Sequence, residues 1–131
     1  MQTFNMIIDG APVQSGRLIE VVNPATGRPF ATVSAGDAGH VDQAVAAARA
    51  AFPAWSALPD AERRAYVMRL ADLLEANMPE FMELVTRETG KPLGGLNNVG
   101  AGMEVGGAIA WTRVTASLGV AGSDLPAAGP V

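Results

Sequence analysis

Short apolar runs alternate with turn-forming residues over positions 1–35, a pattern that favours β-strands joined by tight turns. Asp9-Gly10 forms one predicted turn because glycine accepts a positive φ, and Asn23-Pro24-Ala25-Thr26-Gly27 forms another. Each turn separates two β-branched runs, 6–8 from 11–13 and 18–22 from 30–33. The pattern therefore predicts two β-hairpins.

From residue 36 onward the apolar positions recur about every 3.6 residues, which is the period of an α-helix. We expect Asp37 to cap the N-terminus of this first helix and Pro53 to end it. Its apolar stripe should lie against a sheet or another helix. The stripe consists of Val41, Ala44, Val45, Ala48 and Phe52.

A second helical pattern begins near Pro59, with Asp60 and Glu62 placing negative charge at the positive end of the helix dipole. Asn77-Met78-Pro79 interrupts the pattern, so the segment is either one kinked helix or two helices. Gly90 should end it as a C-terminal cap. The predicted buried positions are Val67, Leu70, Ala71 and Leu74, then Phe81, Leu84 and Val85.

A third helical pattern spans 96–118, although each of its glycines costs about 1 kcal/mol relative to alanine. We expect its buried stripe to use Val99, Met103, Ala110 and Val114. Residues 119–131 are mostly Gly, Ala, Ser and Pro and are predicted to form a flexible tail. The chain is thereby divided into hairpins at 1–35, helices at 36–118 and a tail at 119–131.

The composition narrows the classes of function. A chain of 131 residues is long enough for one domain, and its 49% apolar content suggests that some apolar faces await a partner. The net charge of −4 and the scattered basic residues argue against nucleic-acid binding. Neither a secretory signal in residues 1–9 nor a membrane-spanning run is predicted, so we expect a cytoplasmic protein.

Candidate catalytic residues are few. The chain has no cysteine, which removes thiol nucleophiles, and its one histidine, His40, has no second metal ligand near it in the sequence. We interpret His40 as a solvent-facing residue at a helix start, and Asp60 with Glu62 and Glu80 with Glu83 as first-turn charges that compensate helix dipoles. A triad built on Ser34, Ser56, Ser117 or Ser123 would depend on His40 and is not expected.

Three further features have structural interpretations. Gly100, Gly102 and Gly106 miss the dinucleotide fingerprint, whose third glycine would stand where Val105 is, so close helix packing is expected there instead. Lys91 is expected to complement the negative end of a helix dipole. The aromatic residues Phe52, Trp55, Phe81 and Trp111 are expected in the core. We assign no catalytic, cofactor-binding or metal-binding residue.

The order of these features resembles the amino-terminal region of NAD(P)-dependent aldehyde dehydrogenases. Each motif alone has little specificity, but the series at these spacings is strongly suggestive, and the resemblance covers about residues 7–118. The motifs are Asn23–Gly27, Val41–Phe52 followed by Trp55, Glu62-Arg63, Leu70–Glu75 and Glu88–Leu93.

The resemblance implies part of an α/β fold in which β-hairpins precede three or four helices that flank a parallel sheet in the whole enzyme. It implies NAD or NADP as the coenzyme of the parent and oxidation of an aldehyde to a carboxylic acid through a cysteine thiolate. The family's Pro-Trp-Asn turn, Lys-x-x-Glu strand end, glycine-rich turn, glutamate base and catalytic cysteine are not in this sequence. We therefore expect a truncated or frame-shifted chain that binds no coenzyme and has no activity alone.

Two other functions stay open at this point. The first is a catalytically dead helical interaction module that pairs with a homologous subunit, whereas the leading hypothesis makes the rest of the enzyme the partner. The second, with least support, is anion binding at the helix starts near Asp37 and Pro59, both of which are already acidic.

Overall fold

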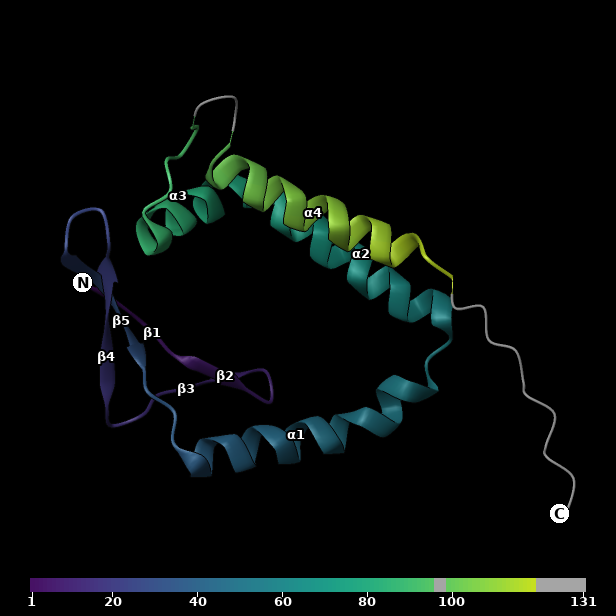
Figure 1. Ribbon diagram of the computed structural model, residues 1–131. Coiled ribbons are helices and arrows are strands. Elements are labelled where there is room, and N and C mark those ends of the chain that lie inside the picture. Colours follow the sequence, from purple (N-terminus) through teal and green to yellow (C-terminus); the bar gives the residue numbers. More distant parts are fainter. Residues whose placement is uncertain (96–98, 120–131) are drawn as a thin grey trace, which may run out of the picture.

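A computed structural model describes residues 1–95 and 99–119 of the chain (Figure 1). Five short strands precede four helices, and the α2–α4 pair lies apart from α1. The strands are β1 (Gln2–Phe4), β2 (Met6–Ile8), β3 (Ala11–Val13), β4 (Leu18–Asn23) and β5 (Arg28–Ser34). The helices are α1 (Ala38–Ala57), α2 (Asp60–Ala76), α3 (Met78–Thr89) and α4 (Ala101–Ser117).

Both predicted hairpins are present. β2 pairs antiparallel with β3 around Asp9-Gly10, where both residues have positive φ, and β4 pairs antiparallel with β5 around the 23–27 turn. The sequence analysis missed β1, which pairs in parallel with β5 and makes a three-stranded sheet of order β1-β5-β4. Its hydroxyl at Thr3 lies 2.8 Å from that of Thr32. A strand of three residues whose partner is distant along the chain has no local signal.

Helix α1 confirms one predicted boundary and corrects the other. Asp37 caps the N-terminus, but the helix continues through Pro53 to Ala57, so the predicted stop is wrong. Proline removes one helical hydrogen bond without ending a helix whose flanking residues are good helix formers. The end comes at Leu58, which is extended (ψ 141°) because the following Pro59 disfavours helical backbone in the residue before it.

The interrupted pattern at 77–79 resolves into two helices. Asn77 follows α2 and precedes α3, and its side-chain amide donates to the Leu73 carbonyl at 2.8 Å. Gly90 ends α3 in the left-handed conformation with φ 74°, as predicted. Its backbone N–H donates to the Thr86 carbonyl. Pro59 is the residue immediately before α2 rather than a member of its first turn.

Helix α4 buries a different stripe from the predicted one. The buried residues are Ala101, Val105, Ile109 and Ala116, whereas the predicted Val99, Met103 and Val114 are 46–60% exposed and Ala110 is exposed too. The buried stripe faces α2, which runs beside α4 in Figure 1 and contributes the fully buried Ala71. A regular spacing identified α4 as a helix, but two apolar stripes share that spacing.

The core of the described residues is small and consists mainly of alanine. Besides the four buried residues of α4, it holds Ala31, Ala35 and Ala71, with Ser34 as a buried polar neighbour. The aromatic residues expected in the core are exposed instead: Phe52 by 64%, Trp55 by 41%, Phe81 by 37% and Trp111 by 72%. Their placement corrects the sequence interpretation. Helices α2, α3 and α4 contact one another through alanine, Val105 and Ile109, and these contacts leave the bulkier stripes uncovered.

None of the residues of helix α1 is buried, and the same is true of α3. Ala44, Ala47, Ala48 and Ala51 line a shallow groove against the β2–β3 hairpin. The expected contact with a sheet is therefore made by one edge of the helix only. The larger members of the predicted stripe, Val41, Val45 and Phe52, stay 43–64% exposed.

Candidate functional site

Two motifs that are far apart in the sequence, the 23–27 turn and the 88–93 segment, meet at one junction. In the 23–27 turn, the Asn23 side-chain oxygen accepts from the backbone N–H of Ala25 at 2.9 Å, and Gly27 has φ 67°. Pro24 of this turn lies against Gly90, where an added Cβ would be 3.1 Å from the Pro24 Cγ atom. Glycine at position 90 therefore allows both the left-handed backbone at the end of α3 and the close approach of Pro24.

Contacts beside the junction hold α3 on the sheet. The Arg87 guanidinium lies 4.5 Å from the centre of the Phe30 ring on β5, a cation–π contact, and 3.3 Å from the Glu83 carboxylate. The Thr89 hydroxyl donates to the Val85 carbonyl at 2.6 Å. These contacts fix the end of α3. They do not bring an acid, a base and a nucleophile together as a catalytic site would require. The junction is therefore an architectural site.

Lys91, directly after the junction, forms an ion pair with Glu104 of α4. The sequence analysis gave Lys91 only a role at the helix dipole, so this direct partner is new. Both side chains are about half exposed, 50% and 48%, and an exposed pair of this kind contributes little to stability. Its effect is to tie the 90–95 segment to the start of α4.

Arg113 makes the main polar connection between α2 and α4. Its guanidinium lies 2.5 Å from the Glu75 carboxylate and 2.9 Å from that of Asp72. Hydrogen bonding to Glu75, and then to Asp72, raises the pKa of Arg113 above its usual value. The guanidinium also donates to the Met68 sulfur at 3.7 Å. Sequence reasoning missed this cluster because Arg113 is 38 to 45 residues away from its partners in the sequence.

His40 has a structural role at the start of α1. Its Nδ1 atom lies 2.6 Å from the Asp37 carboxylate, and Asp37 accepts from the His40 backbone N–H at 3.0 Å. These bonds lower the pKa of Asp37, the backbone bond most strongly. The His40 side chain is only 19% exposed, so the expected solvent-facing position is wrong. The imidazole belongs to a helix cap.

Two of the four candidate carboxylates form ion pairs within their own helices. Asp60 lies 2.9 Å from Arg64 and 3.6 Å from Arg63, and Glu83 pairs with Arg87. Asp60 and Glu62 lie in the first turn of α2, and Glu80 lies in that of α3. Glu83, which was also expected in a first turn, lies one turn later. The dipole interpretation thus holds for three of these residues.

The candidate serines bond to groups that are not catalytic bases. The Ser34 hydroxyl bonds to the Asn5 side chain at 3.3 Å, and those of Ser56 and Ser117 donate to backbone carbonyls. Ser123 lies outside the described residues, as does most of the predicted tail.

The glycines around position 102 belong to helix packing, as expected. Gly100 precedes α4, and Gly102 and Gly106 lie inside it. A Cβ at Gly102 would lie 3.3 Å from the Met82 side chain of α3, so the missing side chain allows close contact. Val105, at the third fingerprint position, is buried. This geometry offers no turn between a strand and a helix to cradle phosphates.

Residues 1–95 and 99–119 contain neither a cluster of metal-ligating side chains nor a helix suited to a membrane. No three His, Asp or Glu side chains there form a group that could hold a metal ion. In the same ranges, no helix has the length and apolar character needed to cross a membrane.

The junction brings the Asn23–Gly27 turn and the Glu88–Leu93 motif together. Comparison with known proteins identifies the fold in which they meet. The model of the aldehyde dehydrogenase family matches residues 11–122. The chain belongs to this family. The resemblance predicted from the sequence is confirmed, as is the partial α/β fold with strands followed by helices.

Two curated aldehyde dehydrogenases illustrate how much of an enzyme the match spans. The 5-carboxymethyl-2-hydroxymuconate semialdehyde dehydrogenase of Escherichia coli is 39% identical over 99 residues, which are 76% of this chain and 21% of that enzyme. The N-succinylglutamate 5-semialdehyde dehydrogenase of Escherichia coli K12 is 50% identical over 70 residues, or 53% of this chain and 14% of that enzyme. The chain spans about a fifth or less of these relatives.

Solved aldehyde dehydrogenases have the same fold in the corresponding region. The NAD-dependent enzyme from Sinorhizobium meliloti superimposes with a TM-score of 0.79 at 32% identity, over 87% of this chain and 23% of that one. PnpE, solved in complex with nicotinamide adenine dinucleotide, gives 0.79 at 37% identity over 86% and 23%. The arrangement of strands and helices is therefore that of a much longer chain.

Proposed function

We propose that this chain forms the amino-terminal part of the coenzyme-binding region of an NAD(P)-dependent aldehyde dehydrogenase, whose whole chain oxidises an aldehyde to a carboxylic acid. The observation that carries the proposal is the match of residues 11–122 to the family, combined with a span of only 21–23% of full-length members. The partner is then the rest of such an enzyme. From the sequence we also propose a cytoplasmic location, which cell fractionation tests.

The chain by itself is proposed to be inactive. The family's route requires a cysteine thiolate to attack the aldehyde carbonyl, and the 131 residues contain none. The described residues also do not fit a dinucleotide, because the glycines nearest to the fingerprint lie at the start of and within α4 and the third position is the buried Val105. The choice between NAD and NADP accordingly belongs to other parts of the enzyme.

Two measurements test this function. The purified chain, mixed with an aldehyde and NAD or NADP, should give no absorbance increase at 340 nm and no heat of coenzyme binding. Reduction of either coenzyme by the chain alone would refute the proposed inactivity. In the second measurement, residues 11–119 replace the matching segment of the Escherichia coli 5-carboxymethyl-2-hydroxymuconate semialdehyde dehydrogenase. The chimera should retain aldehyde-dependent NAD reduction, and a folded but inactive chimera would contradict the family role.

The exposed apolar side chains favour a second candidate, a helical interaction module that pairs with a homologous subunit. Val41, Phe52, Leu73 and Trp111 are each at least 60% exposed, which is unusual for an isolated soluble domain. A module should melt cooperatively as a monodisperse species. A part of a larger enzyme should instead bind the dye ANS while it is still folded and aggregate as it is heated, so a thermal melt followed with ANS distinguishes the two.

A further inference from the structure

Two methionines of α3 fill the space that two glycines of α4 leave open. A Cβ at Gly102 would lie 3.3 Å from the Cε atom of Met82 and 4.0 Å from its sulfur. A Cβ at Gly106 would lie 4.0 Å from the Cε atom of Met78. The two methionines are about one helical turn apart, as are the two glycines, so each pair lies on one face of its helix. We call these two methionine–glycine contacts together the thioether contact.

Polar bonds do not hold α3 on α4. The side-chain hydrogen bonds and ion pairs of α3 in the described part of the chain join its residues to one another or to Lys91 next to it. Lys91 in turn pairs with Glu104 of α4, but both side chains are about half exposed, and such a pair contributes little. The attachment of α3 to α4 therefore depends on apolar packing, in which the thioether contact takes part.

The same two methionines are within reach of small solutes. Both are half-buried, and they line an open hollow of about 520 Å³ together with Glu75, Pro79 and Leu93. A water molecule takes up about 30 Å³ in the liquid, and hydrogen peroxide is larger by only one oxygen atom, so the hollow admits it easily. Met78 and Met82 thus combine a packed position with access for an oxidant.

We propose that Met78 and Met82 form a site of reversible oxidation, and that their modification by peroxide releases α3 from α4. A sulfur lone pair attacks one oxygen of hydrogen peroxide, so that a sulfur–oxygen bond forms and the O–O bond breaks. The proton of the new S–OH group passes to the departing hydroxide, which leaves as water. Each sulfur loses two electrons, and the peroxide gains them. The inference does not depend on the proposed function.

The consequence follows from the polarity of the sulfoxide. Its oxygen requires hydrogen bonds to water or to the protein, whereas the thioether is apolar and requires none. The space over Gly102 and Gly106 is taken up by the methionine side chains themselves. An oxidised side chain should therefore turn into the hollow, where water can reach its oxygen, and leave the glycines uncovered. The apolar contact between the two helices is then lost.

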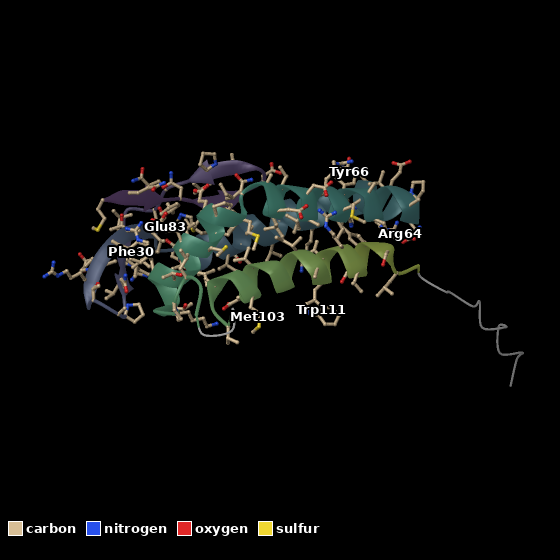
Figure 2. The ribbon with its side chains drawn as sticks, turned by 90° about the horizontal axis from the view of Figure 1, so that it is seen from above. Phe30, Arg64, Tyr66, Glu83, Met103 and Trp111 are labelled. Carbon is tan, nitrogen blue, oxygen red and sulfur yellow. The ribbon has the colours of Figure 1, made fainter. Side chains whose placement is uncertain are left out.

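Leucine substitutions inside and outside the contact test the proposal. Leucine keeps an apolar side chain of similar volume and has no sulfur to oxidise. M78L/M82L removes both proposed oxidation sites and retains Met68 and Met103. M103L is the matched control, because Met103 is 60% exposed and projects outward from α4 in Figure 2. The full chain and each variant are treated with hydrogen peroxide. Mass spectrometry then measures the oxygen gained at each methionine and the deuterium exchange of the 78–89 backbone.

Peroxide should speed exchange in 78–89 by about tenfold in the wild type and in M103L, and by less than about twofold in M78L/M82L. Exchange in α1 is the internal reference, and methionine sulfoxide reductases A and B should restore the original rates. Each variant is compared with its own untreated form, so a difference in starting stability does not enter.

Three results overturn the proposal. The first is that Met78 and Met82 stay unmodified while Met103 is fully oxidised. The second is complete oxidation of both residues without faster exchange in α3. The third is an equal rise in M78L/M82L, which would assign the effect to another methionine. The first two results need only the wild-type chain, so the test stands even if the double variant does not fold.

Discussion

Substitution of Gly90 by alanine tests how the two family motifs hold each other in place. Gly90 has φ 74° at the end of α3, and its missing side chain faces Pro24 of the 23–27 turn. Alanine in left-handed backbone costs about 1 kcal/mol. The new Cβ would also lie 3.1 Å from the Pro24 Cγ atom, which has to move by a few tenths of an ångström. Together these effects should destabilise the fold by about 1–2 kcal/mol.

Gly107 provides the matched control. It lies inside α4 without positive φ, and a Cβ there would meet nothing within 4 Å. The same substitution, G107A, should stabilise the chain by about 1 kcal/mol because alanine favours helix. Two identical changes should thus have opposite signs. The double variant P24A/G90A lacks the close contact but keeps the cost of the left-handed backbone. The difference between its change in unfolding free energy and the sum of the changes in the two single variants therefore measures the contact.

Urea unfolding followed by circular dichroism and tryptophan fluorescence gives the magnitude. With a slope of about 2 kcal/mol/M, G90A should lower the midpoint by about 0.5–1 M. Coincident transitions from the two probes are required for this conversion. A neutral or stabilising G90A, with G107A behaving the same way, would refute the claim that position 90 needs left-handed backbone.

Two further predictions concern charges. The lowered pKa of Asp37 means that its capping stabilises the fold above its usual pKa of 3.8 and loses that effect as pH falls through the lower folded-state value. Wild type should therefore exceed D37N in thermal midpoint at pH 7, and the difference should shrink as the pH falls below 3.8, the ordinary pKa of the group; a constant difference would contradict this assignment. R113M should destabilise the chain through the lost pairs with Asp72 and Glu75, and the loss should shrink in 1 M NaCl because these groups are solvent-accessible. R49M, at an exposed position of α1, is the control, and an R113M effect that salt leaves unchanged would argue against an electrostatic origin.

Local features of the fold were readable from the sequence because they depend on neighbouring residues. Asp37 was recognised as an N-cap and Gly90 as a C-cap from residue type and position alone. The hairpin at Asp9-Gly10 followed in the same way. Turns and caps are decided within a few residues, so pattern and physical chemistry suffice.

The wrong boundary at Pro53 shows the limit of local reasoning. A proline weakens a helix at one hydrogen bond, but it ends the helix only where the preceding residue must leave the helical conformation as well. That happened at Leu58, before Pro59, and not at Phe52. The two prolines were distinguishable only by the backbone that the chain adopted.

The sequence by itself determined that two hairpins precede a series of helices, that the 131 residues hold no thiol nucleophile and that they resemble aldehyde dehydrogenases, because all three depend on residue identity and spacing. Tertiary structure decided which face of α4 is buried, that Pro24 meets Gly90, and that Arg113 joins α2 to α4. Periodicity reports that a helix has an apolar stripe, but a helix with two such stripes gives the same period for both. Contact with α2 is what distinguished Val105 and Ile109 from Met103 and Val114.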